Sequence, residues 1–134
     1  MNRIFICSRL RGKNETEFNK HVELAQKFSK FVSVKGYGAP FTPHLLYPQF
    51  LDDSVDRERD LGIESGLVYL DVCDGLFAFV DDSETVSEGM RQEIQYAIDH
   101  GIKVVPFIYK NGRIKPKPKL LNEWSQIWLK ATRI

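Results

Sequence analysis

The stretch LFAFV at residues 76–80 is an uninterrupted apolar run of five residues, typical of a β-strand that is buried on both faces. Similar runs at 3–8 and 103–107 predict further buried strands. Residues 39–42 form a fourth candidate, either a short strand or an extended stretch, because Pro40 cannot donate to a central ladder.

Apolar residues recur at helical spacing in the segments between and after these runs. The predicted helices cover residues 14–35, 56–73, 87–100 and 120–131, and residues 43–55 are expected to form a long loop. Strands that alternate with helices indicate parallel βαβ units. We therefore expect the α/β class, a single-domain three-layer α/β/α sandwich over residues 1–134 with a mainly parallel sheet of four or five strands.

The composition excludes several classes of protein. Hydrophobic residues make up 43% of the 134 residues and charged residues 28%, as in ordinary folded domains. The formal net charge of +1 argues against a general nucleic-acid binder, and no apolar run approaches the roughly 20 residues that span a bilayer. Cys7 and Cys73 lie far apart without a CxxC pattern, so neither a metal site nor a disulfide is expected. We expect a soluble cytoplasmic domain without a cofactor.

Ligands of open parallel sheets bind beyond the carboxyl ends of the strands, where the strand order reverses. We expect the first strand beside the third, which brings together the loops at 8–12 and 81–89. Hydroxyls, guanidinium groups, backbone N–H groups and a helix N-terminus at one place favour an anion, most naturally a phosphate. The candidate ligand-binding residues of these loops are Ser8, Arg9, Arg11, Gly12, Asp81, Ser87, Gly89 and Met90.

The third predicted helix carries the pattern Ser87-x-Gly89-x-x-x-Glu93. Gly89 and Glu93 are four residues apart and share a face, so the missing side chain leaves room for a ligand over the carboxyl group. A carboxylate placed there can attack an anomeric carbon, hold a ribose hydroxyl or cap a structural network.

Simpler interpretations compete with each of these. Arg9 and Arg11 taken alone are typical of solvated loop charges, and Ser87 alone is an N-cap. His21 and His44 lack partners at metal-ligand spacing, so a solvent-facing or hydrogen-bonded role is favoured over metal binding. The Asp pairs at 52–53 and 81–82 are typical of turns. Two tryptophans on the last helix, Trp124 and Trp128, usually belong to a core but modestly favour an oligomer interface.

Three segments together resemble the nucleoside 2-deoxyribosyltransferase superfamily, which includes nucleotide N-hydrolases. They read FICSRLRG at 5–12, CDGLFAFV at 73–80 and SxGxxxE at 87–93, and the resemblance covers roughly 3–107. It implies the deoxyribosyltransferase fold, which is flavodoxin-like. It also implies that Glu93 corresponds to the nucleophile that takes the deoxyribosyl group, and that Ser87 and the loop after the first strand hold a 5′ phosphate.

The chain departs from that pattern at two places. Gly66 stands where the enzymes carry an acid that assists departure of the base, and Ile4 and Phe5 stand where they commonly have a tyrosine. Glu64 or Asp71 could replace that acid only in a shifted register. Loss of a general acid typically lowers a rate by about two to four orders of magnitude. A pocket that keeps its ligand-holding groups and lacks its acid is typical of a binding protein.

The middle of the chain narrows the resemblance. PHLLYPQFLDD at 43–53, ERxLG at 58–62 and SEGM at 87–90 are similar to small phage and firmicute proteins of the superfamily. Among these are the phage Thoeris anti-defence proteins, which as oligomers sequester a cyclic ADP-ribose isomer made by TIR-domain enzymes and do not cleave it. The resemblance implies a homo-oligomeric, non-catalytic protein that binds such a nucleotide.

In that role, Arg9, Arg11 and Ser87 would hold the diphosphate and Glu93 a ribose hydroxyl. Adenine would stack on an aromatic side chain, for which the candidates are Tyr47, Phe50 and Phe79. Two other hypotheses remain open. One is a deoxyribosyltransferase or N-glycosidase with Glu93 as catalytic nucleophile, and the other is an interaction module with a vestigial pocket.

Overall fold

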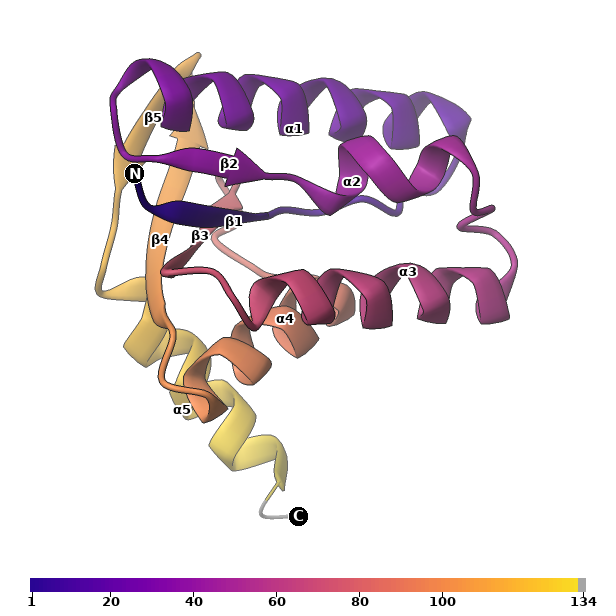
Figure 1. Cartoon of the computed structure of the whole chain (residues 1–134). Helices are drawn as coiled ribbons and strands as arrows, with labels where there is room; N and C mark the ends of the chain where they lie inside the picture. The colour runs from indigo at the N-terminus through magenta and orange to yellow at the C-terminus, as the bar shows by residue number, and fades with distance from the viewer. Residues whose placement is uncertain (133–134) are drawn as a thin grey trace.

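A five-stranded sheet lies at the centre of the computed structural model, which describes residues 1–132 and the side chains as far as Trp128 (Figure 1). Its strand order is β2-β1-β3-β4-β5. The strands are β1 (Arg3–Cys7), β2 (Ala39–Phe41), β3 (Gly75–Val80), β4 (Lys103–Lys110) and β5 (Arg113–Pro116). The first four are parallel and β5 is antiparallel to β4. The predicted neighbours of the first strand are thus confirmed.

The helices form a layer on each face of this sheet (Figure 1). They are α1 (Glu15–Val34), α2 (Pro43–Leu46), α3 (Asp56–Leu70), α4 (Glu88–Asp99) and α5 (Leu120–Thr132), with a 3-10 turn η1 (Tyr47–Gln49). α1 covers one face, and α3, α4 and α5 cover the other. The expected single-domain α/β sandwich with a mainly parallel sheet is confirmed. Residues 133 and 134, which the expected domain includes, lie outside the described residues.

Alternation along β1 explains the two layers, because successive side chains of a strand point to opposite faces. Ile4 and Ile6 pack with Phe28 of α1, whereas Phe5 and Cys7 pack with the helices of the other face. These four of the five β1 residues are less than 5% exposed, as the apolar run predicts for a central strand.

Residues 43–55 differ from the expected long loop. They contain α2 and η1, each beginning with a proline at its first or second position. Proline suits the first turn of a helix because the N–H that it lacks has no partner there. Helices this short leave no periodic pattern in a sequence, and the segment was therefore not predicted to be helical.

Residues 113–119, which follow β4 and carry four basic side chains, are partly a strand. Asn111 and Gly112, with φ of 52° and 73°, form a tight turn that brings Arg113–Pro116 back along β4 as β5. No helix among residues 1–132 is long and apolar enough to cross a membrane.

Candidate functional site

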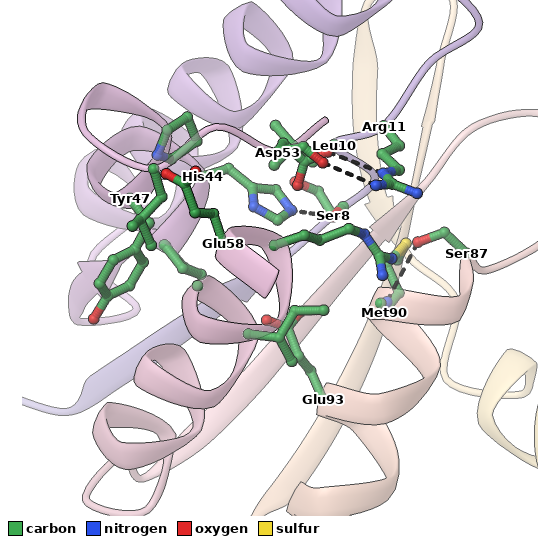
Figure 2. A pocket seen from close by; sticks show the side chains of 17 residues that line it. Ser8, Leu10, Arg11, His44, Tyr47, Asp53, Glu58, Ser87, Met90 and Glu93 are labelled. Carbon is green, nitrogen blue, oxygen red and sulfur yellow. Dashed lines mark hydrogen bonds and ion pairs between the residues drawn. The ribbon is translucent and has the colours of Figure 1, made fainter. Parts of the chain in front are cut away.

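A cavity of about 80 Å³ lies beyond the carboxyl ends of β1 and β3, between α2, α3 and the N-terminus of α4 (Figure 2). The two loops predicted to meet do so here. Seven of the predicted site residues line the cavity, namely Ser8, Arg11, Tyr47, Ser87, Gly89, Met90 and Glu93.

Ser8 has a polar atom without a partner. Its side chain is 3% exposed, and its hydroxyl is the sole buried side-chain N or O atom of the described residues that makes no hydrogen bond. The Ser8 carbonyl oxygen is occupied, because it accepts a hydrogen bond of 2.6 Å from Nε2 of His44. An unpaired buried hydroxyl costs free energy, about 1–3 kcal/mol, unless a molecule in the cavity pairs with it.

The N-terminus of α4 forms the opposite wall. Ser87 is its N-cap, and the Ser87 hydroxyl accepts a hydrogen bond of 3.3 Å from the Met90 N–H. A Cβ added at Gly89 would lie 3.7 Å from Nη2 of Arg59, so this guanidinium group rests against the first turn of α4. Within residues 1–132, Arg59 forms no ion pair. A cation beside the positive end of a helix is unfavourable by itself. The negative charge of Glu88 in the first turn of α4 offsets part of this, and an anion bound between Arg59 and the helix would offset more.

Glu93 forms the floor of the cavity and reaches from α4 toward α3 (Figure 2). It is 4% exposed, and burial raises its pKa to about 8. A Cβ added at Gly66 would lie 3.9 Å from its Oε2. Burial, and the adjacent Glu93 carboxyl, also raise the pKa of the Cys7 thiol. At neutral pH Glu93 is therefore mainly a carboxylic acid, able to donate a hydrogen bond.

Arg11 lines the cavity but is engaged with the segment before α3 (Figure 2). Its Nε lies 3.1 Å from Oδ2 of Asp53, its Nη2 donates to the Asp53 carbonyl at 2.8 Å, and Asp56 lies 3.6 Å away. In this conformation Arg11 ties the loop after β1 to residues 53–56.

Four other predicted site residues lie outside the cavity. Arg9 instead donates to the backbone oxygen and hydroxyl of Thr85 at 3.5 and 3.4 Å. Asp81 closes a turn with Ser83, whose hydrogen bonds lower the Asp81 pKa. Gly12 and Phe50 line an open groove that adjoins the cavity and shares Arg11 with it. The turn interpretation of Asp81 is thus confirmed. The four residues do not line the cavity, and their contact with a ligand stays a prediction.

The expectation that Phe79 stacks on a base was also wrong. Phe79 is 2% exposed and stacks on Phe28 of α1 with ring centroids 4.4 Å apart. Its position in β3 directs it to the α1 face, because strand residues alternate and Ala78 and Val80 face α4.

Several residues of the cavity were missed from the sequence. They are His44, Asp53, Glu58, Arg59, Gly62 and Ile63. The sequence of α3 contained a pattern that could have identified some of them, since positions 59, 62, 63 and 66 have helical spacing and share one face. A Cβ added at Gly62 would lie 3.7 Å from Leu51, and one added at Gly66 would lie 3.6 Å from Pro43, both ordinary van der Waals contacts.

His44 is hydrogen-bonded, one of the two predicted alternatives, and it also lines the cavity. Burial lowers its pKa, so the ring is neutral at pH 7. No group of three or more His, Cys, Asp or Glu in the described part of the chain is arranged to hold a metal ion.

Comparisons with known proteins agree with this fold. A family model described as "Domain of unknown function (DUF7768)" matches residues 2–107, and no curated protein matches the chain. Among solved structures, the chain is similar to a 2-deoxyribosyltransferase from the psychrotolerant bacterium Bacillus psychrosaccharolyticus, with a TM-score of 0.57 and 18% identity. The match covers 84% of this chain and 77% of that one. At this identity the similarity establishes a deoxyribosyltransferase-like fold.

Proposed function

Because this chain belongs to the DUF7768 family, a domain family of unknown function, we propose its function from its own cavity: it binds a nucleotide and holds it without cleavage. One observation carries the proposal. The unpaired hydroxyl of Ser8, the unpaired guanidinium of Arg59 and the N-terminus of α4 line one cavity. We expect one phosphate group to pair with all three.

The size of the cavity supports a binding mode in which the phosphate lies in the cavity and the base lies outside it. About 80 Å³ accommodates a phosphate group and is too small for a whole nucleotide. The adjoining groove, with the 64% exposed Phe50 on its wall, offers a place for the base. Tyr47, beside the cavity, is the other aromatic candidate. Glu93, as a hydrogen-bond donor, would hold a ribose oxygen.

Three features favour retention of the ligand over cleavage. A nucleophile must be ionised, and Glu93 with a pKa of about 8 is mainly neutral at pH 7. Gly66 of α3, where an added Cβ would lie 3.9 Å from Oε2 of Glu93, supplies no acid. The other cavity carboxylates are engaged, Glu58 with the Asp52 N–H and Asp53 with Arg11. An N-glycosidase or deoxyribosyltransferase that uses Glu93 as nucleophile is the alternative.

The narrower proposal is that the ligand is a cyclic ADP-ribose-type signalling nucleotide. Sequestration of it by a homo-oligomer in the host cytoplasm would counteract a TIR-dependent antiphage defence. The resemblance of residues 43–53 and 58–62 to phage anti-defence proteins supports this, and Tyr47 and Arg59 of those segments line the cavity.

The test is recovery of the ligand. The protein is incubated separately with AMP, deoxynucleoside monophosphates and the cyclic product of a TIR enzyme, freed of unbound nucleotide, and denatured by heat. Mass spectrometry of the supernatant should detect intact nucleotide. Free base, or linear ADP-ribose produced from the cyclic compound, would contradict the proposal. If Glu93→Gln abolished this cleavage, the result would support the alternative, an enzyme that uses Glu93 as nucleophile. Retention of no nucleotide at all would contradict both.

Replacement of Ser8 should change the stability of the free protein and its affinity for AMP in opposite directions. In Ser8→Ala, loss of the unpaired buried hydroxyl should raise the free energy of unfolding by about 1 kcal/mol without ligand. The affinity for AMP should fall by about fivefold to tenfold, since one hydrogen bond to a charged group is lost. Chemical denaturation and calorimetric titration measure the two quantities. A variant that is less stable and binds AMP as well as the parent would show that the hydroxyl has a structural role.

A further inference from the structure

The C-terminal part of the chain holds the loop that leads into α4. Trp124 of α5 is 3% exposed, and its indole N–H donates to the backbone oxygen of Glu84 at 2.8 Å. Lys117, between β5 and α5, forms an ion pair with the Glu84 carboxylate. Two groups from one segment therefore fix the backbone and the side chain of a single loop residue.

Glu84 has an unusual backbone conformation. Its φ of 57° lies in the left-handed region, which costs a non-glycine residue roughly 1 kcal/mol or more. Such a conformation persists only where surrounding contacts impose it. The loop supplies one contact itself, the hydrogen bond of 3.0 Å from the Glu84 N–H to the Asp81 carbonyl. Trp124 and Lys117 supply the others.

The residue after Glu84 connects this conformation to the cavity. Thr85 accepts hydrogen bonds from Arg9 and contacts the Ser83 hydroxyl at 2.8 Å, and two residues later Ser87 caps α4. A change of φ at position 84 would therefore rotate the chain immediately before the cap and Gly89. The family match ends at residue 107, so both groups that hold Glu84 lie outside the matched region.

We propose that Trp124 and Lys117 are positioning residues, which hold Glu84 in its left-handed conformation and thereby set the N-terminus of α4 at the geometry that binds an anion. This inference goes beyond the proposed function, because it assigns the β5–α5 segment a role in a cavity that it does not line. It predicts that changes at Trp124 or Lys117 alter the N-terminus of α4 and weaken anion binding, in addition to any effect on the stability of the fold.

The experiment compares Trp124→Phe with Trp128→Phe in the full chain. Phenylalanine keeps the ring in the core and removes the N–H that reaches Glu84, whereas Trp128 packs against the same core and makes no hydrogen bond to that loop. Hydrogen exchange of the amides of residues 85–90 is measured without ligand. We expect about tenfold faster exchange in Trp124→Phe than in Trp128→Phe. A change of this magnitude corresponds to the loss of one hydrogen bond. Equal exchange in the two variants would overturn the proposal.

Binding and rescue provide the second readout. The affinity for AMP and for inorganic phosphate should fall about fivefold to tenfold in Trp124→Phe, and Lys117→Met should act in the same direction. Adding Glu84→Gly to Lys117→Met should restore part of the lost affinity, because the ion pair is already absent there and glycine adopts positive φ without strain. A Trp124→Phe variant that is destabilised but binds AMP normally would show an ordinary core residue, and a Lys117→Met variant whose weak binding Glu84→Gly does not improve would contradict the role of the left-handed conformation. If the parent protein binds neither probe, the proposed function fails, and the exchange comparison alone decides this inference.

Discussion

Arg59→Gln is expected to weaken the binding of AMP by about 10- to 100-fold, because it removes the charged partner of a phosphate held in the cavity. The free energy of unfolding should change by no more than about 0.5 kcal/mol, since Arg59 forms no ion pair with any other described residue. Calorimetric titration with AMP and denaturant unfolding give the two values.

The same helix offers a matched control. Arg57 is exposed and does not line the cavity, so Arg57→Gln removes the same charge from α3 and should leave AMP affinity within about twofold of the parent. Comparable losses in the two variants would indicate a general electrostatic effect of net charge and contradict a phosphate contact by Arg59.

The second large effect concerns the stability of the protein as a function of pH. The pKa of Glu93 is about 8 in the folded protein and near 4.5 in an unfolded chain. The folded state thus binds the proton more tightly, and its stability is complete below pH 4.5 and falls as the pH rises toward 8. Over this interval the loss is about 3–5 kcal/mol, at about 1.4 kcal/mol per pH unit.

Glu93→Gln removes this dependence, because an amide of nearly the same shape stays neutral. Relative to the parent, its free energy of unfolding should be similar near pH 4.5 and about 3–5 kcal/mol higher at pH 8. The opposite slope caused by His44, whose pKa is lowered by burial, is present in both proteins and cancels. Denaturant unfolding at several pH values measures the difference.

Glu64→Gln serves as the control, since Glu64 is an exposed glutamate of α3. Its stability curve should run parallel to that of the parent. A parallel curve for Glu93→Gln as well would mean that the Glu93 carboxyl is ionised in the folded protein at neutral pH, and the case for an ionised nucleophile would then gain strength.

Local sequence was sufficient for most of the fold. The apolar runs at 3–8, 76–80 and 103–107 lie in central strands, whose burial on both faces leaves an unbroken hydrophobic signal. The α4 cap was equally predictable, because Ser87 and Gly89 act within a single turn of helix. The turn at Asp81 depends on its neighbour Ser83 and was predicted for the same reason.

The errors lie where a role depends on residues distant in the chain. Phe79 was misassigned because the face of β3 that meets α1 is chosen by packing of the whole sheet. α2 and η1 were missed because elements of three or four residues have no measurable period. Arg59 was missed because the functional relevance of its face of α3 arises only where that face meets the N-terminus of α4.

The amino-acid sequence alone determined the three central strands, the main helices, the order that places the first strand between the second and third, and the pair of loops that meet at the candidate site. These follow from hydrophobic period and short-range hydrogen bonds, which act between near neighbours in the chain. Only the tertiary structure decided which polar groups remain unpaired in the cavity, that Arg11 is engaged by Asp53, and that Trp124 holds Glu84 from 40 residues away. Burial and pairing are properties of the assembled packing, in which segments without a local signal for each other come into contact.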